Sequence, residues 1–333
     1  MSTGRYVEVC AGAGGWGIGL HRAGWRGTGI EWDADASETH RRHVGPCITA
    51  DITTAPSPHP ADLVCGGVPC QSFSLAGNRG GLDDPRGQLF RALLRHAAEA
   101  GARCVALENV RGLISCGALP VILAAFRAHG YEPVHALLNA CDYGVPQNRV
   151  RLFIVGFRDA ADLARFRWPA PTHGAPGNMW GLKPWRTVRD ALGLGGADGS
   201  RLDRVSPCIT ASEQKSANAF GSRGAVTSPR RAGDLLNSLL SRLDRPSPTI
   251  TIGHHEPIAG QATRKALFGE MAEVRDGSRL TVRDCARLQS FPDEVEFCGV
   301  VGAQYRQVGN AVAPLMGEAI ARSVWAALYG GAL

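Results

Sequence analysis

Short apolar segments alternate with helical segments over residues 6–160, and no other feature of the chain constrains its fold so strongly. The segments expected to form strands are 6–10, 27–30, 61–65, 104–107 and 151–155. Between these strands, apolar residues recur at helical spacing in 89–100 and 119–129. Strands alternating with helices predict an α/β fold with a doubly wound, mostly parallel sheet. Such folds bind ligands outside the carboxyl ends of their strands, so side chains there are candidate site residues.

An irregular region begins after about residue 160. Pro, Gly, Ser and Arg become frequent there, and apolar periodicity fades until helical patterns return at 282–290 and 314–328. The region holds a near-repeat, Leu-Asp-Arg-Val-Ser-Pro-Cys-Ile-Thr at 202–210 and Leu-Asp-Arg-Pro-Ser-Pro-Thr-Ile-Thr at 243–251. Because 333 residues are enough for two domains, we expect a second, smaller and irregular domain in this region.

The net charge of +6 is concentrated in one quarter of the chain. Residues 160–243 hold 12 Lys and Arg against 6 Asp and Glu, which accounts for the whole excess. A localised basic segment favours a polyanionic partner. No apolar run approaches the ~20 residues of a membrane span, and the N-terminus has no signal-peptide core. We therefore expect a cytoplasmic protein without a membrane partner.

Ten cysteines are spread along the chain, and none forms a Cys-x-x-Cys pair. The nearest approach to a metal cluster is His40, His43 and Cys47, with Glu38 nearby. No second ligand pair follows at zinc-site spacing, so we expect no metal site. The thiols are expected to be mostly reduced and buried.

A glycine-rich turn follows the first predicted strand. Glycines from Gly12 to Gly17 fit the pattern Gly-x-Gly-x-x-Gly, which is typical of turns that approach a nucleotide cofactor. Glu31 ends the second strand, where a carboxylate can hold a ribose diol. This pattern alone suits both nicotinamide dinucleotides and S-adenosylmethionine. Asp51 could accept the amine of an adenine, although its Asp-x-Thr sequence is also a common helix cap.

The segment after the third predicted strand is the most distinctive in the chain. It has the sequence Cys-Gly-Gly-Val-Pro-Cys-Gln-Ser-Phe-Ser at 65–74. The glycines allow a sharp turn at the sheet edge, and Pro69 stiffens the approach to Cys70. A thiol held on such a loop near backbone N–H groups is a candidate thiolate nucleophile. The alternative is a buried structural cysteine.

Two further groups of polar residues adjoin predicted strands. Glu108 follows the strand at 104–107 and could act as a general acid. Arg149 and Arg151 precede or open the last predicted strand and could bind a phosphate or a carbonyl oxygen. Either group standing alone could equally be a surface ion pair.

Taken in order, these segments resemble the motifs of the cytosine-C5 DNA methyltransferase family. The matching segments of the first half are Ala-Gly-Ala-Gly-Gly at 11–15, Glu-Trp-Asp at 31–33, Asp-Ile-Thr at 51–53, Gly-Gly-Val-Pro-Cys-Gln at 66–71, Asp-Pro-Arg-Gly at 84–87, Glu-Asn-Val at 108–110 and Gln-x-Arg-x-Arg at 147–151. The segments 279–292 and 304–312 are similar to the last two blocks of that family. The resemblance covers residues 6–160 and 243–325 and implies a class I methyltransferase fold of the Rossmann-like type.

The resemblance also implies a reaction. The methyl donor would be S-adenosylmethionine, which leaves as S-adenosylhomocysteine, and a thiolate would add to C6 of a flipped-out cytosine so that C5 can take the methyl group. The implied catalytic residues are Cys70, Glu108, Arg149 and Arg151. The implied cofactor-binding residues are Ala11, Gly12, Ala13, Gly14, Gly15, Glu31, Trp32, Asp51, Asn310 and Val312.

The family pattern implies three parts of the chain. These are a catalytic and cofactor-binding domain at 1–160, a target-recognition domain at 161–279, and a C-terminal segment at 280–333 that returns to the catalytic domain. The implied contacts to double-stranded DNA are Gln71, Ser74, Arg86, Thr249 and Ile250. The earlier near-repeat, with Ile209 and Thr210, competes with the later one for target recognition. An enzyme of this length further resembles monomeric prokaryotic methyltransferases of restriction–modification systems, with a cognate endonuclease as functional partner.

A few positions depart from the family pattern. Many members have Phe where Cys10 stands, and that ring packs on the adenine. Trp16 or Trp32 could compensate for its loss. The other departures are Val68 in place of Pro or Phe, Asp284 in place of Glu, and Ser278 in place of Arg. They affect packing and cofactor affinity rather than the chemistry.

Three other functions fit part of the pattern. The same chemistry could act on RNA, although the long basic middle region favours a duplex target. A nicotinamide-dependent oxidoreductase would use the glycine-rich turn but would leave Cys70, Glu108 and Asn310 without roles. A non-catalytic DNA-binding relative would not need Cys70, Glu108 and Arg151 together.

Overall fold

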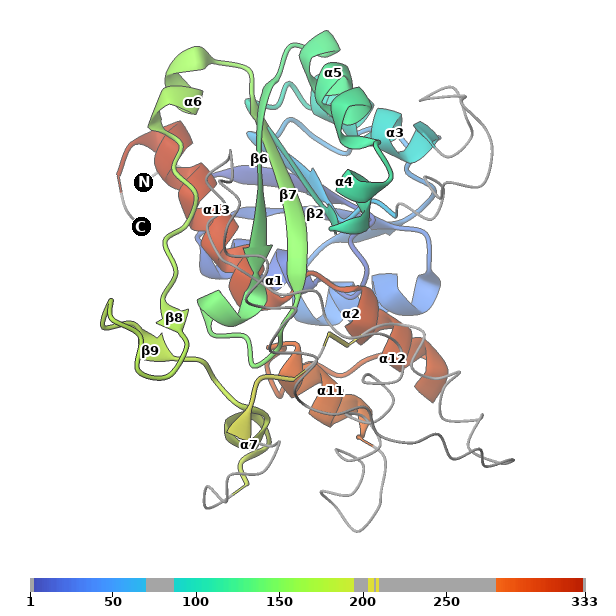
Figure 1. Ribbon diagram of the computed structural model, residues 1–333. Helices are drawn as coiled ribbons and strands as arrows, with labels where there is room; N and C mark the ends of the chain where they lie inside the picture. Colours follow the sequence, from blue (N-terminus) through green and yellow to red (C-terminus); the bar gives the residue numbers. More distant parts are fainter. Residues whose placement is uncertain (1–2, 70–86, 195–202, 207, 210–279, 332–333) are drawn as a thin grey trace.

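The structure is a computed structural model that describes residues 3–69, 87–194, 203–206, 208–209 and 280–331. Seven strands form one sheet in the order β3-β2-β1-β4-β5-β7-β6 (Figure 1). Their bounds are β1 (Arg5–Val9), β2 (Arg26–Glu31), β3 (Cys47–Thr49), β4 (Leu63–Gly66), β5 (Cys104–Val110), β6 (Glu132–Asn139) and β7 (Val150–Phe157). The pairs among β1 to β5 are parallel, whereas β7 is antiparallel to both β5 and β6. The predicted doubly wound, mostly parallel sheet is therefore confirmed.

The described helices agree with those expected from the sequence, and several further elements appear. The predicted helices correspond to α3 (Gln88–Glu99), α5 (Leu119–Ala128), α11 (Val282–Leu288) and α13 (Pro314–Tyr329), each beginning within one residue of its expected start. The elements without a counterpart among the predictions include β3, β6, α1 (Gly15–Arg22), α2 (Ala34–His43) and α12 (Val301–Asn310). Strand β3 has only three residues, β6 contains Pro133 and His135, and α2 is almost entirely polar. Their apolar patterns are therefore too weak to predict from.

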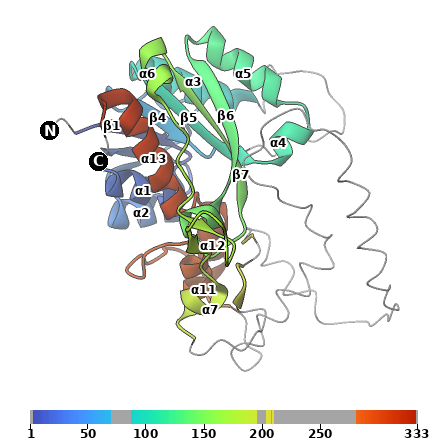
Figure 2. The same cartoon turned by 60° about the vertical axis from the view of Figure 1, so that its left-hand side comes forward.

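Side chains alternate between the two faces of the sheet, as strand geometry requires. On β1, Tyr6 packs in the cluster that includes α1 (Gly15–Arg22) and α13, whereas Val7 and Val9 pack in the cluster that includes α3 and α5. Figure 2 shows these helices on opposite sides of the sheet. Burial of a large apolar side chain contributes about 1.5–3 kcal/mol. The two layers therefore hold the strands firmly and leave only their ends available for a site.

The C-terminal helix α13 packs against α1, at the opposite end of the chain (Figure 1). Glycines allow this close contact. A β-carbon at Gly19 would lie 2.4 Å from the backbone nitrogen of Glu318, and one at Gly317 would lie 2.9 Å from the Trp16 ring. The chain just before α13 is thereby brought beside the first glycine-rich turn.

A third apolar cluster lies around α7 (Val188–Leu192), α11 and α12. Capping boxes begin α7 and α11. At α11, Asp284 Oδ2 accepts hydrogen bonds from the backbone nitrogen and hydroxyl of Thr281, at 3.0 and 2.8 Å. Aspartate therefore completes this cap at the position where the family more often has Glu.

The remaining described elements are short. They are α4 (Gly112–Ser115), η3 (Ala140–Tyr143), α6 (Ala160–Arg165), β8 (His173–Gly174) and β9 (Lys183–Pro184). Among the described residues, none of the helices has the length and apolar character needed to cross a bilayer.

Candidate active site

The predicted site residues gather at one edge of the sheet because of strand direction. Parallel strands β1, β2, β4 and β5 all end at this edge. Strand β7 runs the other way, so its first residues lie there too, with Arg151 opposite Val110 in the register of β5 and β7. An arginine at the start of β7 is thus brought to a carboxylate at the end of β5.

The glycine-rich turn links β1 to α1 through left-handed backbone. Gly12 has φ 55° and Gly14 has φ 84°, conformations that favour glycine. Gly14 donates to the Ala11 carbonyl at 3.0 Å and forms the N-cap of α1, and Ala13 is buried beneath. A β-carbon at Gly12 would meet no atom within 4 Å. The turn therefore leaves open space at Gly12.

Glu31 fastens the end of β2 to this turn. Its Oε2 accepts from the Gly12 N–H at 2.8 Å, and its Oε1 accepts from the Asp33 N–H at 3.0 Å. Burial raises the pKa of Glu31, while these two N–H groups oppose the rise. A buried carboxylate with both oxygens oriented by backbone is a rigid acceptor for a pair of hydroxyl groups.

The two tryptophans that could replace a missing aromatic ring differ completely in exposure. Trp16 is only 1% exposed and packs edge-on against Phe153 at 5.8 Å between ring centroids. Trp32 is 81% exposed at the end of β2. Only Trp32 of this pair can stack on a ligand. Cys10 itself has φ 50°, and burial raises the pKa of its thiol to about 12.

Asp51 caps a turn rather than a helix. Its Oδ1 accepts from the backbone nitrogen and the hydroxyl of Thr53, both at 2.8 Å, and no helix begins at these residues. The side chain is exposed. Among the described residues, no group donates a hydrogen bond to Asp51 Oδ2. This oxygen can therefore accept a hydrogen bond from an amine.

A buried acid–histidine pair lies beneath the turn, and the sequence analysis did not predict it. Glu8 Oε2 lies 3.8 Å from His40 Nε2, and both side chains are almost fully buried. A β-carbon at Gly17 would lie 2.9 Å from Glu8 Oε2. The available signal was a charged residue in the middle of an otherwise apolar strand, which needs a partner when buried.

The histidines and cysteine near α2 have separate structural roles. The ring of His40 reaches Glu8, His43 Nε2 lies 3.0 Å from the Glu296 backbone nitrogen, and Cys47 accepts from Ser37. In the part of the chain that is described, no three His, Cys, Asp or Glu side chains form a group able to hold a metal ion.

The loop after β4 passes directly beside Glu108. A β-carbon on Gly67 would lie 3.2 Å from Glu108 Oε2. The Asn109 side chain donates to the Val68 carbonyl at 2.8 Å, and the Val68 side chain is buried. The loop is thus held in place at the residues immediately before the candidate nucleophile. The predicted residues Cys70, Gln71, Ser74 and Arg86 lie outside the described residues.

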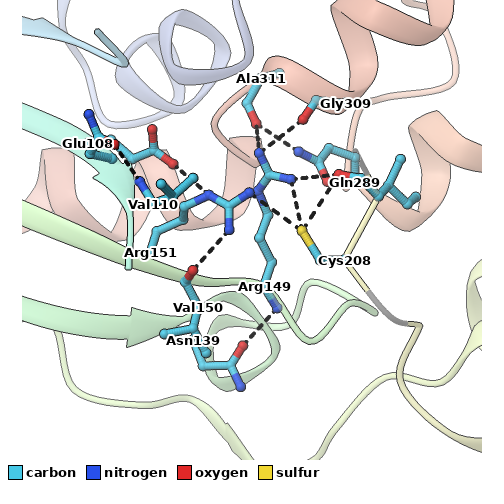
Figure 3. A network of polar contacts seen from close by, with 12 residues as sticks. Glu108, Val110, Asn139, Arg149, Val150, Arg151, Cys208, Gln289, Gly309 and Ala311 are labelled. Carbon is cyan, nitrogen blue, oxygen red and sulfur yellow. Dashed lines mark hydrogen bonds and ion pairs between the residues drawn. The ribbon is translucent and has the colours of Figure 1, made fainter. Parts of the chain in front are cut away.

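Glu108 and Arg151 form a mostly buried ion pair (Figure 3). Arg151 Nε lies 3.1 Å from Glu108 Oε1. The Arg151 Nη1 donates to the Val150 carbonyl at 2.9 Å, and Nη2 donates to Cys208 Sγ at 3.5 Å. The guanidinium is therefore fixed on three sides, next to the carboxylate that flanks the β4 loop.

Arg149 lies beside Arg151, since both guanidinium groups contact Cys208, and it holds three chain segments together (Figure 3). Its guanidinium donates to the carbonyls of Ile209, Gly309 and Ala311 at 2.9–3.1 Å. The side chain is 2% exposed, and burial lowers its pKa, with a further contribution from Arg151. This geometry gives Arg149 a supporting position rather than contact with reacting atoms.

Gln147 joins Ile209 to the end of α11 and was not among the predicted site residues. Its Oε1 accepts from the Ile209 N–H at 3.0 Å, and its Nε2 donates to Gln289 Oε1 at 2.6 Å. Cys208, next to Ile209, was also not predicted. The earlier near-repeat therefore reaches this site, whereas Thr249 and Ile250 of the later one lie outside the described residues.

Val312 lies between the glycine-rich turn and the β4 loop. Its carbonyl oxygen would be 2.2 Å from a β-carbon at Gly15, and its Cγ2 would be 3.8 Å from one at Gly67. Asn310, also predicted, is exposed at the end of α12. The C-terminal segment thus packs beside both glycine-containing loops.

Comparison with known proteins identifies the family. The family model described as C-5 cytosine-specific DNA methylase matches residues 4–326. The chain is 32% identical over 330 residues to the Type II methyltransferase M.NgoMIV of Neisseria gonorrhoeae, covering 97% of each protein. It is 40% identical over 220 residues to the Type II methyltransferase M.AquIA of Picosynechococcus sp., covering 56% of this chain and 87% of that protein.

Solved structures show the same fold. A putative DNA modification methyltransferase encoded within an E. coli prophage has a TM-score of 0.61 at 23% identity, over 97% of this chain and 99% of that chain. The S. pombe Dnmt2 methyltransferase has a TM-score of 0.61 at 16% identity, over 98% and 99%. The chain therefore belongs to the C-5 cytosine-specific DNA methylase family, whose methyl donor is S-adenosylmethionine.

Proposed function

We propose that this enzyme methylates carbon 5 of a cytosine flipped out of a specific double-stranded DNA sequence, through a covalent bond between Cys70 Sγ and C6 of the base. The observation that carries the proposal is the Glu108–Arg151 pair at 3.1 Å beside Gly67. Three residues of chain span at most about 11 Å between α-carbons. We infer that Cys70, three residues after Gly67 in the sequence, can reach the pair.

Carbon 5 of cytosine is too weakly nucleophilic to take a methyl group unaided. Addition of the Cys70 thiolate to C6 forms an S–C6 bond and moves the C5–C6 π electrons onto C5. Glu108 would hold N3 and the exocyclic amine, and Arg151 would hold O2, so that charge developing on the ring is neutralised. The ion pair supports this assignment, because it keeps the two groups side by side.

The second half of the reaction restores the ring. After C5 has gained the methyl group, a base removes the C5 proton, and the electron pair of that C–H bond re-forms the C5–C6 double bond. The S–C6 bond breaks and Cys70 leaves as a thiolate. The thiol is thus regenerated, and the DNA carries 5-methylcytosine.

The residues near the first turn fit S-adenosylmethionine, which supplies an electrophilic methyl group on a sulfonium sulfur when bound. The fit rests on the buried Glu31 carboxylate, the open space at Gly12 and the exposed Trp32 ring. Glu31 would hold the ribose hydroxyls, Trp32 would cover the adenine, and Asp51 Oδ2 would accept its amine. The other residues proposed to line the site are Ala11, Ala13, Gly14, Gly15, Asn310 and Val312.

Double-stranded DNA would contact the loop around Cys70 and the basic middle region. The proposed contacts are Gln71, Ser74, Arg86, Thr249 and Ile250. In a stacked duplex, C6 of cytosine is not accessible to a thiolate. The base must therefore be extruded, and the lost stacking and pairing cost a few kcal/mol. Arg149 would act by holding the walls of the pocket that receives the base.

The enzyme is of the Type II restriction–modification kind. We further propose that it acts as a monomer and protects its target sequence from a cognate endonuclease. Bisulfite sequencing of DNA from expressing cells would give the target site, and challenge of that DNA with nucleases of the same specificity would test protection.

Transfer of radiolabelled methyl from S-adenosylmethionine tests the reaction. The wild-type enzyme is expected to label duplex DNA and not tRNA, and Cys70→Ser is expected to abolish labelling. Cys298→Ser, at a partly exposed cysteine outside the site, serves as control and should retain the wild-type rate. A fully active Cys70→Ser enzyme would reject the assigned nucleophile.

A further inference from the structure

The sulfur of Cys208 lies between the two arginines of the site (Figure 3). Its Sγ is 3.5 Å from Arg149 Nη1 and 3.5 Å from Arg151 Nη2. Both distances are within hydrogen-bonding range for sulfur, and Cys208 is buried. A buried thiol contacting two guanidinium groups is in an electropositive setting, in which its sulfur is a good acceptor.

The segment that carries Cys208 is attached to the start of β7 by backbone hydrogen bonds. Ser206 donates to the Pro146 carbonyl at 3.0 Å and accepts from the Asn148 N–H at 2.7 Å. Ile209 then donates to Gln147 Oε1 at 3.0 Å. Because both sides of Cys208 are held, its sulfur has a defined position relative to Arg151.

Arg151 needs such a contact for the task proposed for it. A guanidinium has five N–H donors in one plane. Three are used by Glu108 Oε1, the Val150 carbonyl and Cys208 Sγ. These acceptors lie on different sides of the group, so together they set the plane. No other group among the described residues accepts from the remaining N–H bonds on Nη1 and Nη2, which could bind a substrate oxygen. Without the sulfur, the Nη2 end of the Arg151 guanidinium could rotate.

We propose that Cys208 is a positioning residue for the methylation reaction: its sulfur orients the guanidinium of Arg151 toward the O2 atom of the flipped cytosine. This inference rests on the proposed function of Arg151 and gives the earlier near-repeat a role at the catalytic site. The later near-repeat has Thr249 at the matching position, so a hydroxyl oxygen is the alternative acceptor that the chain itself contains.

Two substitutions with side chains of the same shape distinguish the effect of the hydrogen-bond acceptor from the effect of side-chain volume. Cys208→Thr keeps an oxygen near both arginines, whereas Cys208→Val replaces it with a methyl group. The readouts are the rate of covalent trapping on duplex DNA with 5-fluorocytosine at the target, the affinity for S-adenosylmethionine and the thermal midpoint. Cys208→Val is expected to lower the trapping rate about tenfold, because a hydrogen bond to a charged group is lost. Cys208→Thr is expected to stay within about threefold of wild type.

Three outcomes decide the proposal. The affinity for S-adenosylmethionine should be the same in the two variants, and the thermal midpoint should be lower in Cys208→Val, because Arg149 also loses an acceptor. A slow Cys208→Val with a fast Cys208→Thr supports the proposal. Equal trapping rates for Cys208→Thr and Cys208→Val would overturn it. In an Arg151→Lys background the Thr and Val variants should trap alike, because the group that the sulfur orients is gone. An undiminished difference there would show that the sulfur does not act through Arg151.

Controls keep this test separate from the proposed function. Cys141→Val replaces another buried cysteine, whose sulfur contacts Asp142 rather than an arginine, and should trap at the wild-type rate. If wild-type enzyme traps and Cys70→Ser does not, the proposed reaction stands whatever the Cys208 variants do. If wild-type enzyme fails to trap, the proposed function itself is rejected.

Discussion

Gly15 and Val312 are so close that the Val312 carbonyl oxygen would lie only 2.2 Å from a β-carbon at residue 15. The contact joins the first turn of the chain to the segment that leads into its last helix. Contacts between real β-carbons and backbone oxygen are essentially never so short, so any side chain at residue 15 must displace one segment from the other.

Gly15→Ala should therefore weaken S-adenosylmethionine binding by tenfold or more, with an overpacking cost of about 1–3 kcal/mol in stability. Isothermal titration and guanidinium denaturation give the two quantities. Gly112→Ala is the matched control, because a β-carbon there would make an ordinary 3.7 Å contact. Unchanged affinity in Gly15→Ala would show that the Gly15–Val312 contact does not shape the cofactor site.

Glu31→Ala should lower S-adenosylmethionine affinity about 10- to 100-fold, because it removes the carboxylate proposed to hold the ribose. The variant also leaves the Gly12 and Asp33 N–H groups without their acceptor. Titration calorimetry with S-adenosylmethionine and with NADH checks both affinity and cofactor choice. Glu38→Ala, at a surface pair with Arg41 and Arg42, should bind as wild type. Wild-type affinity in Glu31→Ala would refute the ribose contact.

Arg149→Met should destabilise the fold by about 3–5 kcal/mol, because three buried carbonyl groups lose the charged donor that Arg149 supplies. The three are the carbonyls of Ile209, Gly309 and Ala311. Chemical denaturation measures the change. Arg127→Met, which removes an exposed ion pair with Glu132, should change stability by less than about 1 kcal/mol. Equal stabilities of the two variants would argue against the supporting role of Arg149.

His21 makes stability depend on pH. Burial lowers its pKa from 6.5 to about 4, with Arg26 and His40 adding to the shift. The unfolded chain therefore takes up a proton below pH 6.5 that the folded chain refuses, so stability is complete above pH 6.5 and falls as the pH drops toward 4. The expected loss is about 1–2 kcal/mol, because partial exposure screens part of the shift.

His21→Gln should flatten this pH dependence while keeping an acceptor for the Tyr6 hydroxyl, now 3.1 Å from His21 Nε2. Denaturation at several pH values between 7.5 and 4 measures both proteins. Identical slopes in wild type and His21→Gln would contradict the assignment to this histidine.

The sequence predicted the sheet and most of the candidate residues because their signals are local. An apolar strand followed by Gly12 or by Gly66 and Gly67 marks a strand end, and Glu31 and Glu108 stand immediately after such strands. Once the sheet is mostly parallel, all these residues must lie at one edge. The ion pair of Glu108 with Arg151 then follows from the reversed direction of β7.

Other features could not be predicted because they depend on contacts between distant segments. Arg149 stands two residues before Arg151 in the same motif, and its contacts with Gly309 and Ala311 show that it is a buried support. Cys208 lies in an irregular region without periodicity. Trp16 and Trp32 both looked able to replace an aromatic ring, and their exposures of 1% and 81% separate them.

The central claim is a transient bond between Cys70 and the target cytosine. Its most direct test is incubation of the enzyme with S-adenosylmethionine and duplex DNA carrying 5-fluorocytosine at the target, followed by denaturing electrophoresis and peptide mass spectrometry. Fluorine cannot leave C5 as a proton would, so the account predicts a stable adduct mapped to Cys70 and absent from Cys70→Ser. An active enzyme that forms no adduct, or one joined through another residue, would contradict it.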